Sequence, residues 1–250
     1  MSGSLTVVGL GPGAAQQMTP EAVAALEAAD ELFGYGPYLA RAPERPGQVR
    51  HASDNREELD RARAALDRAV AGAQVAMVSG GDAGVFAMAA AVCEAVEKGP
   101  DVYRAVQLSV VPGVTAMLAV AARIGAPLGH DFCAISLSDN LKPWELVTAR
   151  LKAAAQAGFV IALYNPISKA RPWQLGAAFD LLREVLPGTV PVIFGRAAGR
   201  PDERITLATL ADADASVADM ATCVLIGSAD TRVVERPGLS PLVYSPRSAR

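Results

Sequence analysis

Cysteine and histidine are scarce in this sequence, and their scarcity limits the kinds of site that it can carry. Among 250 residues there are three cysteines and two histidines. Cys93, Cys133 and Cys223 are widely separated and form no Cys-x-x-Cys pair. Such spacing argues against a disulfide framework and a zinc site, and it is typical of a reducing compartment. We therefore expect a cytoplasmic protein without a metal site.

Long apolar runs and basic runs are also missing. No apolar stretch approaches the roughly 20 residues that a transmembrane helix needs, and the first residues lack the basic and apolar regions of a secretory signal. The formal net charge is −3 without a basic cluster, which argues against a nucleic acid partner. Over the whole sequence, hydrophobic residues make up 51% and charged residues 20%, which is an ordinary composition for a globular enzyme.

Strand-like and helical segments alternate along the chain. β-branched runs predict strands at residues 5–8, 74–78, 106–111, 133–137, 159–163, 190–194, 205–207 and 223–226. Apolar residues at helical spacing predict helices at 57–70, 85–96, 114–124, 146–157 and 173–186. Another helix is expected to begin at Pro20 with Thr19 as its N-cap. This alternation predicts an α/β protein with mostly parallel sheets.

Glycine and proline cluster at residues 125–129, which predicts a linker. We expect an N-terminal α/β domain over residues 1–125, a C-terminal α/β domain over 126–235, and a cleft between them. Residues 236–250 are rich in Pro, Ser and Arg and are predicted to be a poorly ordered tail.

Several predicted strands are followed by short loop segments that contain Gly, Pro or Asn-Pro, which we call breaks. Open parallel sheets bind their ligands outside the carboxyl ends of the strands, where these breaks lie. They lie at residues 9–13, 80–84, 112–113, 164–166 and 195–196. The first break also fits a dinucleotide motif through Gly9, Gly11 and Ala14, with Asp30 as the ribose acid. That motif needs its helix to begin at the glycines, whereas the helix signals here wait until Thr19. A tight turn without a ligand is the other interpretation.

The second break, residues 79–84, places one acid, Asp82, beside two glycines. A cationic sulfonium would suit this carboxylate better than a phosphate, which it would repel. The alternative is that Asp82 caps the helix that follows. Small residues at 111–116 leave space for a flat group, and Thr115 could donate a hydrogen bond or merely start a helix.

Polar clusters at residues 53–58 and 136–142 stand in predicted loops and could equally be helix caps. His51 and His130 are isolated, as hydrogen-bonded structural or surface histidines usually are. Several cationic residues flank the ligand site that is expected at these breaks. They would suit a substrate with several carboxylates, unless they are only solvated. They are Arg123, Lys142, Arg171, Arg196 and Arg200.

The glycine-rich stretches at residues 9–13 (Gly-Leu-Gly-Pro-Gly), 79–82 (Ser-Gly-Gly-Asp) and 112–116 (Pro-Gly-Val-Thr-Ala) resemble the tetrapyrrole (class III) methyltransferases. Within that family, the sequence is similar to the branch that methylates carbon 17 of precorrin-3B. The matching stretches are residues 53–58, 125–133, 136–144, 164–166 and 195–201. The resemblance runs from about residue 5 to 232. Ala83 departs from it, because the family's Gly-Gly-Asp-Pro-Gly loop has proline there; alanine lacks the fixed φ of proline, which predicts a looser loop.

The resemblance implies two α/β domains, a homodimer, and S-adenosylmethionine as the methyl donor, with S-adenosylhomocysteine as its product. It implies methylation of precorrin-3B and ring contraction to precorrin-4 in cobalamin biosynthesis. The implied cofactor contacts are Gly11, Pro12, Gly81, Asp82, Val85, Thr115, Ala116, Tyr164, Asn165, Gly195 and Arg196.

Ring contraction resembles a pinacol rearrangement of a tertiary alcohol with lactone opening, so it needs a group that moves a proton. Candidates are Asp139, Lys142, Asp54 and His130. Four other functions remain open. They are the cobalt-factor III enzyme of the anaerobic pathway, another tetrapyrrole methyltransferase, a nicotinamide oxidoreductase, and a non-catalytic tetrapyrrole carrier.

Overall fold

The computed structural model describes residues 3–54 and 57–248. The chain divides into two compact units, Met1–Ala116 and Met117–Arg250. The division thus falls at Ala116, ahead of the linker that the sequence predicts at residues 125–129. In the described part of the chain, no helix is long and apolar enough to cross a membrane.

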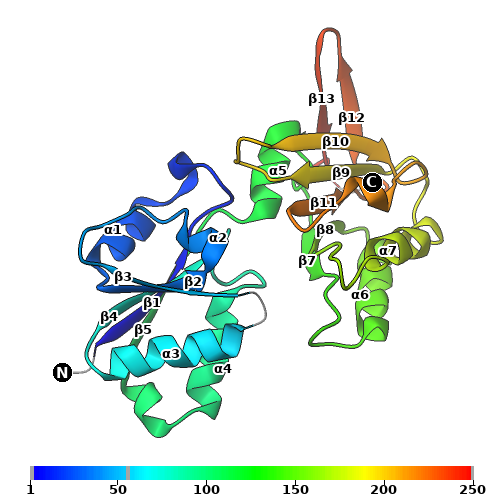
Figure 1. The fold of residues 1–250 in the computed structure, drawn as a ribbon. Coiled ribbons are helices and arrows are strands. Elements are labelled where there is room, and N and C mark those ends of the chain that lie inside the picture. Colours follow the sequence, from blue (N-terminus) through cyan, green and yellow to red (C-terminus); the bar gives the residue numbers. More distant parts are fainter. Residues whose placement is uncertain (1–2, 55–56, 249–250) are drawn as a thin grey trace. The chain divides into compact units, whose positions relative to one another are not determined.

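Unit 1 is built on a five-stranded sheet with the order β3-β2-β4-β1-β5, in which all neighbouring strands are parallel (Figure 1). The strands are β1 (Ser4–Gly9), β2 (Glu31–Tyr35), β3 (Val49–Ser53), β4 (Gln74–Ser79) and β5 (Gln107–Val111). β2 and β3 are not among the strands that the sequence predicts. β2 (Glu-Leu-Phe-Gly-Tyr) contains no β-branched residue, and β3 is an edge strand in which no residue is fully buried.

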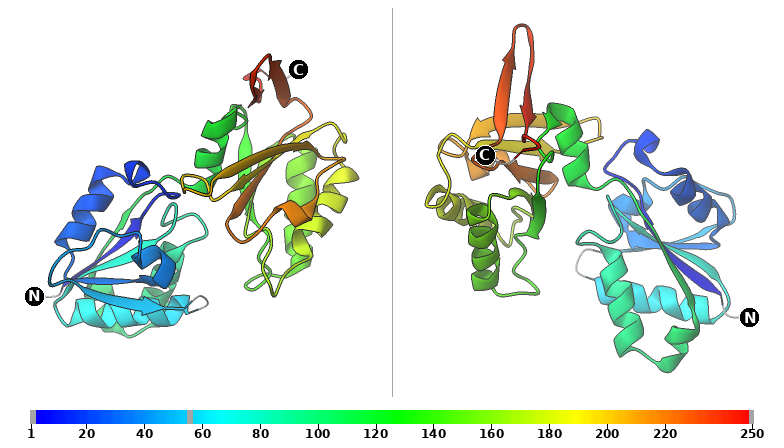
Figure 2. Two further views of the ribbon diagram at one scale, coloured as in Figure 1. Left: turned by 45° about the horizontal axis from the view of Figure 1, so that its top comes forward. Right: turned by 180° about the vertical axis from the view of Figure 1, so that it is seen from behind.

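Helices cover both faces of this sheet (Figure 2). They are α1 (Pro20–Ala28), α2 (Gly36–Leu39), α3 (Glu58–Val70) and α4 (Met88–Lys98), with 3-10 turns η1 (Ala15–Gln17) and η2 (Asp101–Ala105). Successive strand residues point to opposite faces. Val7 and Met77 pack in the core with α3 and α4, whereas Val8 and Val78 pack in the core with α1 and α2. A parallel sheet buried on both faces follows, as this class requires.

Unit 2 holds a second five-stranded sheet with the order β10-β9-β11-β8-β7. Its strands are β7 (Phe132–Ser136), β8 (Val160–Tyr164), β9 (Pro191–Arg196), β10 (Arg204–Thr209) and β11 (Thr222–Ile226). Only β7 and β8 are parallel neighbours, and the other pairs are antiparallel. The α/β class is confirmed, but the prediction of a mostly parallel sheet is wrong for this unit. A loop at residues 197–203, instead of a helix, joins β9 to β10, which makes the two strands a hairpin.

The second sheet is accompanied by three helices and a 3-10 turn: α5 (Ala116–Ile124), α6 (Trp144–Gln156), α7 (Gln174–Arg183) and η3 (Ala215–Val217). The main core lies between the sheet and the pair α6 and α7. Phe179 of α7 meets Phe194 of β9 edge to face, with ring centroids 5.9 Å apart. Such a pair adds favourable ring geometry to the burial of both side chains.

The C-terminal segment contributes to a β-hairpin, so the prediction of a poorly ordered tail is wrong for its described part. β12 (Arg232–Arg236) and β13 (Leu239–Tyr244) form the hairpin, and β13 also pairs with β6 (Gly125–Ala126) (Figure 2). Val243 is fully buried, and the Ser245 hydroxyl donates to the Pro127 carbonyl at 2.6 Å. These contacts join residues far apart in the sequence, which composition cannot reveal.

Candidate functional site

Three turns meet at the carboxyl edge of the unit 1 sheet. β1, β4 and β5 are in register, so that Gly9 pairs with Ser79 and Val8 pairs with Val111. Beyond the strands, Gly11 and Gly81 exchange two backbone hydrogen bonds of 3.0 and 2.9 Å. The glycine-rich turns that the sequence singled out in this half of the chain therefore form one backbone assembly.

Two of these glycines make room for protein and not for a ligand. A Cβ on Gly9 would lie 2.7 Å from the Gly113 nitrogen, and one on Gly113 would lie 2.4 Å from the Gly81 oxygen. A neighbouring turn therefore occupies the space beside Gly9. Gly81 differs, because its φ of +69° favours glycine, while a Cβ there would make only ordinary van der Waals contact, at 3.8–3.9 Å, with the backbone of Thr115 and Ala116.

Asp82 joins the turns through its carboxylate. One oxygen accepts from the Gly84 N–H at 2.8 Å, and the other accepts from the Gly113 N–H at 3.0 Å. Helix α4 begins only at Met88, and its N-cap Ala87 makes no side-chain cap. The alternative of Asp82 as a helix cap is therefore wrong. Each carboxylate oxygen keeps a further lone pair for a ligand.

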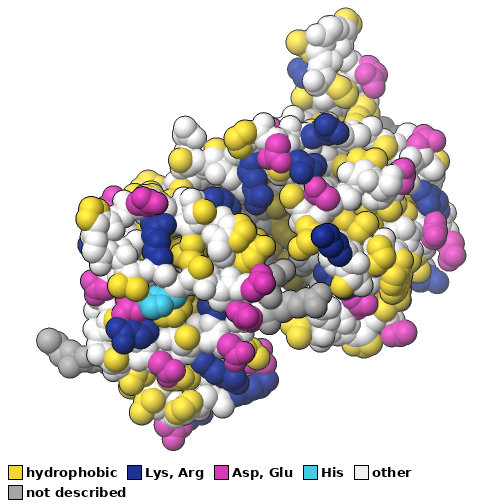
Figure 3. All heavy atoms as spheres, in the orientation of Figure 1, with side chains coloured by type: hydrophobic (Ala, Val, Ile, Leu, Met, Phe, Trp, Pro, Cys, Tyr) yellow, Lys and Arg dark blue, Asp and Glu magenta, His cyan; other side chains and the backbone are white. Residues whose placement is uncertain are grey.

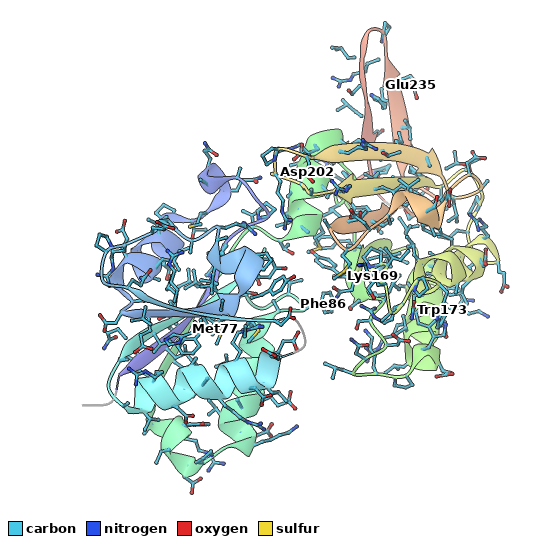
Figure 4. The ribbon with its side chains drawn as sticks, viewed as in Figure 1. Met77, Phe86, Lys169, Trp173, Asp202 and Glu235 are labelled. Carbon is cyan, nitrogen blue, oxygen red and sulfur yellow. The ribbon has the colours of Figure 1, made fainter. Side chains whose placement is uncertain are left out.

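The loop after Asp82 is packed. Ala83 is fully buried in the core with α3 and α4, and its carbonyl accepts from the Ala89 N–H at 2.9 Å. The looser loop that alanine predicts is not what these contacts describe. Val85 is half-buried, and Phe86 is half-exposed with a φ of +51° (Figure 4).

Arg41 and Tyr38 also shape this edge, although the sequence analysis did not identify them. The Arg41 guanidinium donates to the carbonyls of Leu10 and Gly11 at 3.2 and 2.7 Å. A Cβ on Gly80 would lie 2.7 Å from the Tyr38 ring. Both residues come from the α2 region, for which the sequence offered no motif.

The acid–base candidate Asp54 lies in unit 1, at the end of β3. Buried Arg61 donates to the Asp54 carbonyl and to the Ser53 hydroxyl, both at 2.6 Å. Burial lowers the pKa of Arg61. Of the same motif, Asn55 and Arg56 lie outside the described residues.

His51 is structural, as the more common interpretation of an isolated histidine predicts. Its Nε2 lies 2.8 Å from the Glu31 carboxylate, and its ring stacks on Phe33 with centroids 4.1 Å apart. Arg68 binds the same carboxylate. The side chain therefore belongs to an ion network between β2, β3 and α3.

In unit 2, predicted site residues again gather at one sheet edge. Ser136 and Tyr164 are register partners at the ends of β7 and β8. The Tyr164 hydroxyl accepts from the Met117 N–H at 3.0 Å. Asn165 has a φ of +51° and donates from Nδ2 to the Ser136 hydroxyl at 2.9 Å. These bonds fix the chain where both strands end.

The end of β9 is held by packing and by charge. A Cβ on Gly195 would lie 2.1 Å from Val120 of α5, so only glycine fits there. Arg196 donates to Asp202 at 2.6 Å and to Asp219 at 2.7 Å, and these hydrogen bonds raise its pKa. Arg196 therefore already has two carboxylate partners within the protein (Asp202 is labelled in Figure 4).

Asp139 and Lys142 share the loop after β7. The Gln174 amide donates to Asp139 Oδ2 at 3.1 Å, and Arg171 Nε lies 3.9 Å from Asp139 Oδ1. Lys142 is half-buried, and burial, with a smaller contribution from nearby Arg150, lowers its pKa.

His130 lies elsewhere in this unit. It precedes β7 at the other end of the strand, where its Nδ1 accepts from the Asp131 N–H at 2.8 Å. A cavity of ≈580 Å³ also lies away from Asp139, at the C-terminal ends of α6 and α7 between Lys152 and Glu184. Neither feature joins the loop of Asp139 and Lys142.

Comparison with known proteins assigns a family. The model of the Tetrapyrrole (Corrin/Porphyrin) Methylases matches residues 4–214. A protein of Sinorhizobium sp named precorrin-3B C(17)-methyltransferase is 72% identical over 247 residues, which cover 99% of this chain and 97% of that relative. A probable cobalt-factor III C(17)-methyltransferase of Salmonella typhimurium (strain LT2) is 42% identical, covering 96% of this chain and 99% of the relative.

Among solved structures, the methyltransferase CobJ superposes with a TM-score of 0.93 at 49% sequence identity, over 98% of this chain and 100% of that one. The similarity thus extends through both units and includes the turns described above. The family that the sequence resembles is confirmed, and the chain belongs to the tetrapyrrole methylases.

Proposed function

We propose that this protein methylates carbon 17 of precorrin-3B and contracts the macrocycle to precorrin-4, a step of cobalamin biosynthesis. The observation that carries the proposal is the 72% identity, over nearly the full length of both chains, to a protein named for this methylation. As an enzyme of this family it would act in the cytoplasm as a homodimer. Light scattering of the purified protein tests the homodimer.

The proposed methyl donor is S-adenosylmethionine, and the unit 1 edge fits its chemistry. Asp82 offers a carboxylate that suits a cation, and Gly81 lies next to the backbone of Thr115 and Ala116. Bound there, the donor would supply an activated methyl group. The full set of proposed contacts comprises Gly11, Pro12, Gly81, Asp82, Val85, Thr115, Ala116, Tyr164, Asn165, Gly195 and Arg196.

The protein's own contribution to methyl transfer would be positioning. Well-aligned reactants can gain about 7–11 kcal/mol from positioning alone, and the hydrogen-bonded turns are suited to it. For ring contraction, we propose Asp139 as the proton acceptor, with Lys142 of the same loop as a second candidate. Asp54 of unit 1 stays a predicted candidate for the acid–base group. His130 is the least favoured candidate because it lies at the other end of β7 from Asp139.

Incubation of the purified protein with precorrin-3B and methyl-labelled S-adenosylmethionine tests the proposal. We expect one labelled methyl group in the product, by mass spectrometry, together with the changed optical spectrum of a contracted ring. A labelled product that keeps its ring would contradict the contraction. Absence of label would contradict the methyl transfer.

The cobalt-factor III reaction is a second candidate, because a relative named for it is 42% identical over 96% of this chain. Supplying both substrates in parallel separates the two, and we expect the metal-free substrate to react faster. A nicotinamide enzyme is disfavoured because its cofactor phosphates would need a helix that begins at the glycine turn. Here α1 begins only at Pro20, after η1. Calorimetric titration should show binding of S-adenosylhomocysteine and none of NADH. A carrier would bind product without turnover.

A further inference from the structure

Among the cations that the sequence predicts at the substrate rim, Arg171 has an unusual charge environment. Arg123 lies 2.7 Å from Glu203, and Arg196 has two close carboxylates. The Arg171 side chain is only 15% exposed, yet its Nε lies as far as 3.9 Å from the Asp139 carboxylate. Its Nε and Nη1 atoms are buried without a hydrogen-bond partner in the described part of the chain.

Three neighbouring side chains share this property. Asp139 Oδ1, Gln174 Oε1 and Ser168 Oγ are likewise buried without a hydrogen-bond partner among the described residues. We call Asp139, Ser168, Arg171 and Gln174 the polar cluster. Buried polar groups are almost always hydrogen-bonded, and leaving them unpaired costs free energy. The cluster is therefore suited to an occupant that supplies these bonds.

The cluster is held firmly by its surroundings. Gln174 is 1% exposed, and its Nε2 donates to Asp139 Oδ2. The opposite orientation of the Gln174 amide would place its oxygen against the Asp139 oxygen, two acceptors together, so the orientation is fixed by this bond. Ser168 and Arg171 exchange two backbone hydrogen bonds of 3.0 Å. Trp173, labelled with Lys169 in Figure 4, packs edge to face on Trp144 at 4.9 Å.

The unpaired atoms define what the occupant must be. Arg171 offers donors, while Asp139 and Gln174 offer acceptors, and the Ser168 hydroxyl can do either. The charges of Arg171 and Asp139 cancel. A bare carboxylate would supply no donor and would meet Asp139, whereas a hydroxyl group next to an ester oxygen supplies both kinds of partner.

We propose that the polar cluster binds the hydroxyl and lactone groups at which the macrocycle contracts, an inference that rests on the proposed function. Asp139 accepts the hydroxyl proton, and the O–H electrons form the new ketone. The bond from the carbinol carbon to the migrating ring carbon breaks as that carbon bonds to the lactone-bearing carbon. In the same step the bond from the lactone-bearing carbon to the lactone oxygen breaks, and its electrons leave with the new carboxylate, which Arg171 stabilises.

Arg171→Lys tests this assignment, because lysine keeps the charge and loses the planar pair of donors. The assay uses precorrin-3B with labelled S-adenosylmethionine and measures the ratio of contracted to uncontracted methylated product. We expect the ratio to fall about 100-fold, the size of losing one donor to a developing anion. Arg204→Ala, an exposed site on edge strand β10, is the matched control and should keep the parent ratio.

Two further measurements separate binding at this site from a merely structural role. Added guanidinium ion at millimolar concentration should restore contraction to Arg171→Ala, which no packing defect would predict. Should the Arg171 variants fail to fold, Asp139→Asn, which keeps the size of the side chain, should still accumulate methylated, uncontracted product.

An unchanged product ratio in folded Arg171→Lys or Asp139→Asn would overturn the inference. Failure of the parent protein to methylate precorrin-3B would instead overturn the proposed function. The two failures are therefore distinguishable in one set of assays.

Discussion

At the scale of single residues, Asp82 shows how one side chain can hold two turns together. Its two oxygens accept backbone N–H groups from its own turn and from the turn after β5. A carboxylate that aligns two turns also fixes the position of its own charge. The same residue can thus organise the site and face a cationic ligand.

Replacing Asp82 with alanine should therefore destabilise the protein and weaken cofactor binding together. Two backbone donors lose a charged acceptor, and we expect a loss of about 1–3 kcal/mol in the free energy of unfolding. Urea denaturation measures the stability, and titration with S-adenosylhomocysteine measures binding. Asp60→Ala, whose side chain is 81% exposed in the parent, should stay within about 0.5 kcal/mol. Equal stability of Asp82→Ala and Asp60→Ala would contradict the structural role.

Gly81 is expected to tolerate alanine poorly for a conformational reason. Its φ of +69° is unfavourable for a residue with a Cβ, and we expect Gly81→Ala to cost about 1–2 kcal/mol. Gly36 is the matched control, because it has no positive φ and a Cβ there meets open space. Thermal unfolding of both variants makes the comparison, and a Gly81→Ala protein as stable as Gly36→Ala would refute the expectation.

The ion network around Glu31 should make the free energy of unfolding depend on pH. Its hydrogen bond with Arg68, aided by His51, lowers the pKa of Glu31 below the ordinary value of 4.5 in spite of its burial. A lowered pKa in the folded state means that the stabilisation is complete above pH 4.5 and is lost as the pH falls through the folded pKa.

The stability difference between the parent and Glu31→Gln should therefore shrink as the pH falls from about 7 to 3. Urea denaturation across that range measures it. A difference that stays constant with pH would show that the ion network contributes nothing through the charge of Glu31.

At the scale of elements, strand β13 holds together parts of unit 2 that are distant in the sequence. It pairs with β12 on one side and β6 on the other, and its own residue Val243 is fully buried. Ser245 continues the contact by donating to the Pro127 carbonyl. The segment that composition marks as a tail is therefore part of the fold.

Ending the chain after Gly238 should lower the melting temperature by several degrees, since about 1 kcal/mol shifts the Tm of a domain this size by about 2–8 °C. Ending it after Pro246 keeps β13 and should leave the melting temperature unchanged. Thermal unfolding followed by circular dichroism distinguishes the two. Equal melting temperatures would mean that β13 adds nothing to stability.

At the scale of the whole molecule, charges of both signs are interspersed over the surface seen in Figure 3. The net charge of −3 is small. Recognition of a substrate with several carboxylates would therefore depend on individual cations and not on a general positive field. It follows that ionic strength should affect substrate binding only modestly.

Binding of the product nucleoside should stabilise the entire protein. With S-adenosylhomocysteine at about 100 times its Kd, the free energy of unfolding should rise by about 2.7 kcal/mol. The same concentration of NADH should give no shift. A thermal shift with NADH and none with S-adenosylhomocysteine would favour the nicotinamide alternative.

Local sequence determined the helix and strand identities wherever periodicity was strong. Thr19 caps α1 through a 3.1 Å bond from the Ala22 N–H, as the Thr-Pro signal predicts. The glycine-rich turns and the family resemblance also came from sequence, because turn residues and motif spacing are local properties. Asp139 was identified for the same reason, as a polar residue in a loop after a strand.

Tertiary structure alone decided which distant residues meet. Arg171 and Gln174 joined Asp139 only when α7 packed beside the loop after β7, and Arg196 found Asp202 and Asp219 only through strand pairing. The antiparallel β9 and β10 and the ordered β13 likewise depend on pairing partners. Periodicity reports which face of a segment is buried, whereas the partner that buries it is a property of the folded chain.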